Sequence, residues 1–138
     1  MSPTEQILKK HKLRITPIRK EVINLFTDSG HALSSADIEA QMPDADRITL
    51  YRTLKSFEEK GIIHKAIDGT ATQKYALCEA QCDEHIHHDE HVHFHCENCE
   101  LTFCMEGVFV PKVQIPAGFN VTQTDMVVKG VCNKCLAK

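Results

Sequence analysis

The stretch that decides the fold is residues 46–77, DRITLYRTLKSFEEKGIIHKAIDGTATQKYAL. Its first half has the apolar spacing of an amphipathic helix, which Asp46 caps and Lys60-Gly61 ends. The residues expected on the buried side of this helix are Leu50, Leu54 and Phe57. The second half predicts a β-hairpin, with strands over 62–67 and 73–77 joined at Asp68-Gly69.

Shorter helices are expected before this stretch. Ser2-Pro3-Thr4-Glu5 is a capping box that opens the first, and Thr16-Pro17 opens a second that runs to about Asp28. Ser34 or Ser35 caps a third. Short helices, a turn, a helix with a polar face and a hairpin together predict a winged-helix domain.

The composition is that of a folded globular protein, with 42% hydrophobic and 25% charged residues in 138. No apolar run approaches the roughly 20 residues of a membrane span, and the start of the chain does not have the pattern of a signal peptide. We therefore expect a cytoplasmic protein without a membrane partner. In that reducing compartment the 7 cysteines indicate metal or redox chemistry rather than structural disulfides.

The net charge of -3 is distributed unevenly along the chain. Residues 1–66 contain 11 Lys and Arg against 9 Asp and Glu, whereas residues 67–138 contain 5 against 10. DNA binding requires a local basic face rather than a basic protein, so this balance permits it without proving it.

Two CxxC pairs, Cys96-Glu97-Asn98-Cys99 and Cys132-Asn133-Lys134-Cys135, predict a zinc site. Two intervening residues let a tight turn direct both sulfurs at one ion, and four thiolates leave no open coordination position. The predicted role is therefore structural. A thioredoxin-like redox pair would explain one CxxC but not two.

The segment from Cys78 to His95 is dense in Cys, His, Asp and Glu, and the domain boundary is expected near its start. A metal-binding tract is favoured over a solvated, weakly binding loop. If 91–95 is extended, its three histidines share one face and Val92 and Phe94 the other. Further strands are expected over 93–96, 101–105 and 119–128, in a small α/β domain.

The polar face of the fourth helix is the candidate DNA-reading surface. Thr49, Tyr51, Arg52 and also Thr53 are expected to reach the major groove. The residues expected to meet phosphates are Arg14, Arg19 and Lys55. Taken alone, such a face is equally well explained as a solvated helix surface.

Four motifs in this order resemble the ferric uptake regulator (Fur) family. They are Leu13-Arg14-Ile15-Thr16-Pro17-Ile18-Arg19, Thr49-Leu50-Tyr51-Arg52-Thr53-Leu54, His91-x-His93-x-x-Cys96-x-x-Cys99 and Gly130-x-Cys132-x-x-Cys135. The resemblance covers nearly the whole chain. It implies an α+β fold, with an N-terminal winged-helix DNA-binding domain over 1–78 and a small C-terminal α/β dimerisation domain over 79–138.

The resemblance also implies a regulatory metal between the domains, which sets the angle of two DNA-reading heads in a homodimer. The implied ligands are His31, Glu84, His91 and His93, with Cys78, Cys82, His85, His87, His95 and Cys104 as possible additional ones. Nitrogen and oxygen ligands suit Fe²⁺, and an added thiolate suits Zn²⁺, so both metals are candidates. The implied DNA partner is a double-stranded, palindromic, A/T-rich operator, with Arg14 a candidate for the minor groove.

The sequence departs from the family pattern in two respects. Val92 stands where many relatives have an Asp of a further metal site, Pro111 falls about where its helical Glu is expected, and no His follows His95. That further site is therefore not expected. Cys104 stands near an Asp ligand of peroxide-sensing relatives, which disfavours peroxide sensing. Two other classes compete less well: an enzyme, for which no nucleotide or nucleophile motif appears, and a His-rich metal buffer, for which the polar helix would have no role.

Overall fold

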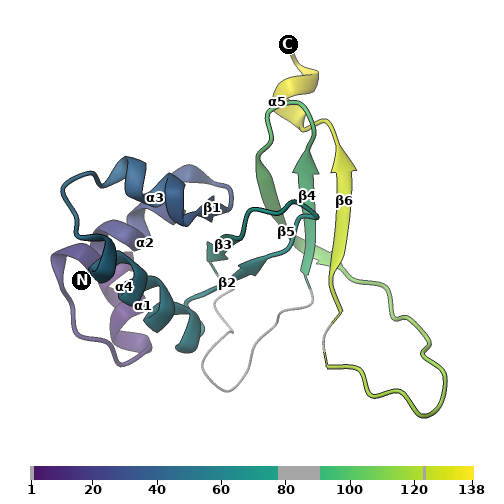
Figure 1. The fold of residues 1–138 in the computed structure, drawn as a ribbon, viewed down its shortest axis with the longest axis horizontal. Helices are drawn as coiled ribbons and strands as arrows, with labels where there is room; N and C mark the ends of the chain where they lie inside the picture. Colours follow the sequence, from purple (N-terminus) through teal and green to yellow (C-terminus); the bar gives the residue numbers. More distant parts are fainter. Residues whose placement is uncertain (1, 78–90, 123) are drawn as a thin grey trace.

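The computed structural model describes residues 2–77, 91–122 and 124–138. Its N-terminal part, here called the helical domain, contains four helices and a small sheet (Figure 1). The helices are α1 (Pro3–Lys10), α2 (Pro17–Ser29), α3 (Ser35–Gln41) and α4 (Arg47–Glu59). The strands are β1 (Leu33–Ser34), β2 (Ile63–Ala66) and β3 (Lys74–Leu77), antiparallel in the order β1-β3-β2.

The helix ends follow the predicted caps. The Thr16 side chain accepts a hydrogen bond from the backbone N–H of Arg19, and α2 ends at Gly30 in the left-handed conformation. Ser34 caps α3, and the Asp46 carboxylate accepts from the backbone N–H of Thr49 at 3.0 Å. These local interactions satisfy N–H groups that have no partner within their helix.

One apolar core holds the helical domain together. Its fully buried members come from α1, α2, α3, α4 and β2, and they include Leu8, Val22, Ile23, Ile38, Leu50, Phe57 and Ile63. The predicted inner face of α4 is confirmed, but the prediction that Thr53 is exposed is wrong. Its side chain is buried, and its hydroxyl donates to the carbonyl of Thr49 at 2.8 Å. Thr53 therefore belongs to the packing of α4.

The C-terminal part, here called the sheet domain, consists of β4 (His91–Cys96), β5 (Thr102–Phe109), β6 (Met126–Gly130) and the short α5 (Asn133–Leu136). Its strand order is β5-β4-β6, with β4 antiparallel to β5 and parallel to β6. The strand predicted over 119–128 begins only at Met126. Phe119 and Val121 are exposed and have no strand partner in the described part of the chain. The strand predicted from the alternating apolar residues therefore starts too early.

The hairpin β2–β3 lies between the helices and the sheet domain (Figure 1). The predicted domain boundary after residue 78 falls in a segment outside the described residues. None of the described helices has the length and apolar character that crossing a membrane requires.

The sheet domain has two different faces. On β4, His93 and His95 alternate with Val92 and Phe94, as predicted for an extended segment. His93 pairs with Cys104 on β5, and the next pair on the same face is His95 with Thr102. This polar face is the one that meets the hairpin.

Candidate metal centres and DNA-facing helix

Four cysteine sulfurs from the two CxxC pairs converge at one end of the sheet domain. The ligand atoms of Cys96, Cys99, Cys132 and Cys135 all lie within 4.8 Å of one another. Two of the separations, Cys96 Sγ to Cys135 Sγ and Cys99 Sγ to Cys132 Sγ, are 3.8 Å. A disulfide would require about 2.05 Å, whereas a tetrahedral ion with Zn–S bonds near 2.3 Å separates its sulfurs by about 3.8 Å. The spacing fits zinc.

The parallel pairing of β4 and β6 brings the two CxxC pairs together. Both strands end at the same edge of the sheet, so Cys96 at the end of β4 meets Cys132 just after β6. Backbone N–H groups of Cys99 and Cys132 donate to Cys96 Sγ at 3.4 and 3.3 Å. They lower the pKa of that thiol to about 6, so the thiolate, which is the metal-binding form, is favoured at neutral pH.

A second group of metal-binding side chains joins the two domains. His64 of β2, His93 of β4 and Cys104 of β5 have ligand atoms within 4.8 Å of one another. His93 is fully buried, His64 is 5% exposed and Cys104 is half-buried. The two imidazole rings lie 5.8 Å apart between centroids. Two imidazoles and a thiol are donors that zinc accepts, so the residues present fit a zinc ion.

This cluster overlaps only in part with the predicted regulatory set. His93 and the possible additional ligand Cys104 are members. Glu84, Cys78, Cys82, His85 and His87 lie outside the described residues, as does the side chain of His91. His64 was missed, because a lone histidine in the apolar run of a hairpin strand is ordinarily read as core. Only the approach of β2 to β4 shows that it faces His93.

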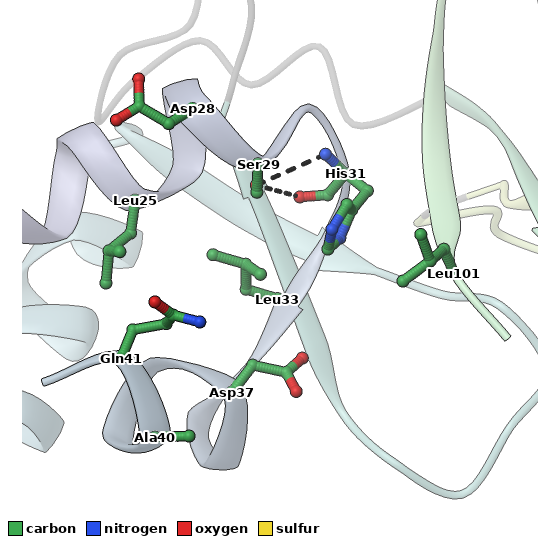
Figure 2. A pocket seen from close by; sticks show the side chains of 9 residues that line it. All are labelled: Leu25, Asp28, Ser29, His31, Leu33, Asp37, Ala40, Gln41 and Leu101. Atoms are coloured by element: carbon green, nitrogen blue, oxygen red, sulfur yellow. Dashed lines mark hydrogen bonds between the residues drawn. The ribbon is translucent and has the colours of Figure 1, made fainter. Parts of the chain in front are cut away.

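His31 stands apart from the cluster. It lines a cavity of about 440 Å³ between α2, α3 and Leu101, and Figure 2 shows its ring between Ser29 and Leu101. Its Nδ1 lies 2.9 Å from the carbonyl oxygen of Ala32, and its ring meets Phe103 edge-on at 6.3 Å. Among the described residues, His93 is grouped with His64 and Cys104, and His31 is not a member of that cluster.

His95, predicted as a possible additional ligand, has other partners. Its Nδ1 lies 2.9 Å from the Thr102 hydroxyl and its Nε2 lies 3.0 Å from a carboxylate oxygen of Glu100. Both ring nitrogens are thus engaged by protein groups. His95 belongs to a hydrogen-bonded network in this structure and not to either metal-binding cluster.

The exposed stripe of α4 has the composition of a DNA-reading surface. Ile48 and Tyr51 are 60% and 64% exposed, and Arg52 and Lys55 continue the same face. Thr49 is exposed, but its hydroxyl donates to the capping carboxylate of Asp46 at 3.1 Å. Ile48 is an additional member of this face, and only the packing of the helix shows that its apolar side chain is exposed.

The two arginines near α2 lie close to each other. Arg14 is exposed, and Arg19 Nη1 donates to the Arg14 carbonyl at 2.7 Å. This bond holds the segment before α2 against the start of that helix. The arrangement is compatible with the phosphate contacts predicted for both residues.

A winged helix joined to a four-cysteine sheet domain defines a DNA-binding regulator that contains metal. The model of the ferric uptake regulator family matches residues 10–129, and the chain belongs to that family. Its members are metal-responsive transcription regulators and not enzymes.

The similar proteins include regulators of ferric uptake and of zinc uptake. The chain is 31% identical to the ferric uptake regulation protein of Staphylococcus epidermidis, over 96% of this chain and 94% of the relative. It is 29% identical to the zinc uptake regulation protein of Escherichia coli, over 99% of this chain and 81% of the relative. Among solved structures it resembles a zinc uptake regulator complexed with zinc and DNA, with 25% identity, a TM-score of 0.63, and coverage of 96% and 90% of the two chains.

Proposed function

We propose that this chain is a cytoplasmic, zinc-responsive transcriptional repressor whose regulatory metal is bound by His64, His93 and Cys104. The observation that carries the proposal is that these donors come from both domains: His64 from the hairpin of the helical domain, His93 and Cys104 from the sheet domain. All three can hold one ion only when the domains are closed. Metal binding energy would therefore favour one orientation of the DNA-reading helix.

The donor set favours zinc over iron. Two imidazoles with one thiolate form a borderline-soft site, and Zn²⁺ accepts such mixed nitrogen and sulfur ligands. Fe²⁺ was supported by a set of nitrogen and oxygen ligands, which the described cluster does not reproduce. The 29% identity to the E. coli zinc uptake regulation protein is compatible with this choice, but it does not decide it, because the identity to a ferric uptake regulation protein is 31%.

The apolar face of the sheet domain supports a homodimer. On this face Val92 and Phe94 of β4 pair with Met126 and Val128 of β6. The two β6 side chains are 38% and 39% exposed. Apolar side chains that remain exposed on one face of a small sheet fit a second copy of the chain. A two-fold dimer would present two copies of α4 to a palindromic operator, with Tyr51 among the base-reading residues.

Operator binding under controlled metal supply tests the proposal. A duplex is first selected from a random pool by the zinc-loaded protein. Its affinity is then measured at fixed salt with protein that retains only the four-cysteine zinc, with buffered Zn²⁺ or with anaerobic Fe²⁺ added. Buffered Zn²⁺ should strengthen binding at least tenfold in the wild type, and His64→Ala should abolish this gain. If Fe²⁺ alone restores binding, the zinc assignment is wrong; if the His64→Ala protein responds like the wild type, the ligand set is wrong.

A further inference from the structure

The turn of the hairpin, residues 67–73, docks on the sheet domain beside the metal-binding cluster. Adjacent residues of β5, β4 and β6 form a row across the sheet, here called the polar row: Thr102, His95 and Lys129. The row next to it contains Cys104 and His93. The hairpin thus meets two neighbouring rows, one with metal-binding donors and one with hydrogen-bonding groups.

Asp68 is the centre of the contact with the polar row. Its carboxylate is 2% exposed and accepts hydrogen bonds from the Thr102 hydroxyl at 2.7 Å and from Lys74 Nζ at 2.6 Å. Thr102 is fully buried, and its carbonyl accepts from the backbone N–H of Ala32 at 2.8 Å. Two segments of the helical domain are therefore bonded to one residue of β5.

The other end of the polar row covers the same turn. A Cβ added at Gly69 would lie 3.2 Å from Cε and from Nζ of Lys129, so this side chain packs directly over the glycine. Gly69 has a φ of +79°, which favours glycine on backbone grounds as well. The turn is held between β5 and β6.

The Asp68 carboxylate is charged and fully engaged. Burial alone would raise its pKa, but hydrogen bonds from Lys74, Thr70 and Thr102 lower the pKa by more than burial raises it. The resulting pKa is well below the ordinary value for an aspartate. A buried carboxylate that lost these partners would be strongly disfavoured, because an unpaired charge in the protein interior is poorly solvated. The contact is consequently specific for one placement of the turn.

We propose that the Asp68–Thr102 contact is a metal-independent latch that positions the hairpin so that His64 faces His93 and Cys104 before the metal binds. The inference rests on the proposed function of the cluster. His64 and Asp68 belong to the same hairpin, and their partners belong to adjacent rows of the same sheet, so fixing one pair aligns the other. Asp68 and Thr102 are positioning residues and are not members of the metal-binding cluster. Without the latch, metal binding must also fix the orientation of the hairpin relative to the sheet domain, which weakens the apparent affinity for the metal.

The test compares Thr102→Val, which removes the hydroxyl at nearly constant volume, with Thr102→Ser, which keeps it. Full-length protein with its four-cysteine zinc in place is titrated with Zn²⁺ against a fluorescent chelator. We expect Thr102→Val to lower the affinity for the second zinc about tenfold, equivalent to about 1.4 kcal/mol, and Thr102→Ser to stay within about threefold of the wild type. Hydrogen exchange of residues 67–73 should rise in the metal-free Val variant only.

A double-mutant cycle separates a latch from a general loss of stability. If Asp68→Asn and Thr102→Val act through one contact, the double variant should bind the second zinc no more weakly than the worse single variant. Additive losses, or wild-type zinc affinity in Thr102→Val, would overturn the latch. If Thr102→Val loses its four-cysteine zinc, Lys129→Ala replaces it in the test, because this variant changes an exposed side chain over the same turn. Lys129→Ala should lower the affinity for the second zinc a few fold. Wild-type affinity for the second zinc in Lys129→Ala would equally overturn the latch.

The proposed function fails by a different result. If His64→Ala and Cys104→Ser bind the second zinc like the wild type, the metal is held elsewhere. If those variants lose the second zinc while Thr102→Val and Asp68→Asn do not, the cluster is correct and the latch is wrong.

Discussion

Replacement of Cys132 by serine should unfold the sheet domain and leave the helical domain folded. Among the described residues from 91 onward, the buried apolar side chains are Val92, Cys96 and Cys132. Burying one such side chain contributes roughly 1.5 to 3 kcal/mol at most. A structural zinc contributes about 10 to 16 kcal/mol in small zinc domains. The metal, and not the core, is therefore the larger stabilising term.

The assay combines metal analysis with hydrogen exchange. After dialysis against a chelator, the wild type should retain one zinc per chain, whereas Cys132→Ser should retain none at the four-cysteine site. Amides of β4 and β6 should then exchange freely, while those of α2 and α4, which pack in the separate apolar core, should stay protected. Cys104→Ser is the matched control and should keep the zinc. A Cys132→Ser protein with a protected β4 would refute the reasoning.

Four further predictions follow from the described contacts. Replacing Tyr51 and Arg52 together by alanine should weaken operator binding at least about thirtyfold in a gel-shift assay, at about 1 to 3 kcal/mol for each of two base contacts, with unchanged zinc content. Cys104→Asp should shift metal preference from Zn²⁺ toward Fe²⁺ in competition titrations, because a carboxylate is a harder ligand. Asp68→Asn should lower the free energy of unfolding, measured by urea titration, by about 3 to 5 kcal/mol at pH 7. Because the pKa of Asp68 is lowered, the difference in stability between wild type and variant should narrow as the pH falls below the ordinary value of 3.8. A difference that stays constant with pH would argue against a charged carboxylate. Val128→Glu should give monomers in sedimentation experiments, and an intact dimer would place the interface elsewhere.

The sequence predicted what local signals determine. Caps at Thr16, Ser34 and Asp46 and the apolar spacing of α4 located the helices to within about two residues, because each signal acts within one turn of chain. The two CxxC pairs predicted the four-cysteine cluster, since the spacing within each pair directs its two sulfurs at one ion. The burial of Thr53 was not predictable, because it depends on what packs against α4.

The regulatory cluster shows where sequence reasoning ends. His93 and Cys104 carried motif or positional signals, but His64 carried none, since its partner lies on a strand of the other domain. The same holds for the Asp68–Thr102 bond, which joins residues 34 positions apart. Contacts between domains depend on how the hairpin docks, and no periodicity within either segment encodes that docking.

The parallel pairing of β4 and β6 also has a consequence for how the chain folds. A β6 antiparallel to β4 would run toward the opposite edge of the sheet and would carry Cys132 away from Cys96. Here β5 ends and β6 begins at the edge of the sheet opposite the four cysteines, so β6 must run the length of the sheet before Cys132 reaches Cys99. The metal centre thus closes over a sequence separation of 33 to 39 residues, a contact that is slow to form. Cys96 and Cys99 are therefore only half of a ligand set until Cys132 and Cys135 have been synthesised.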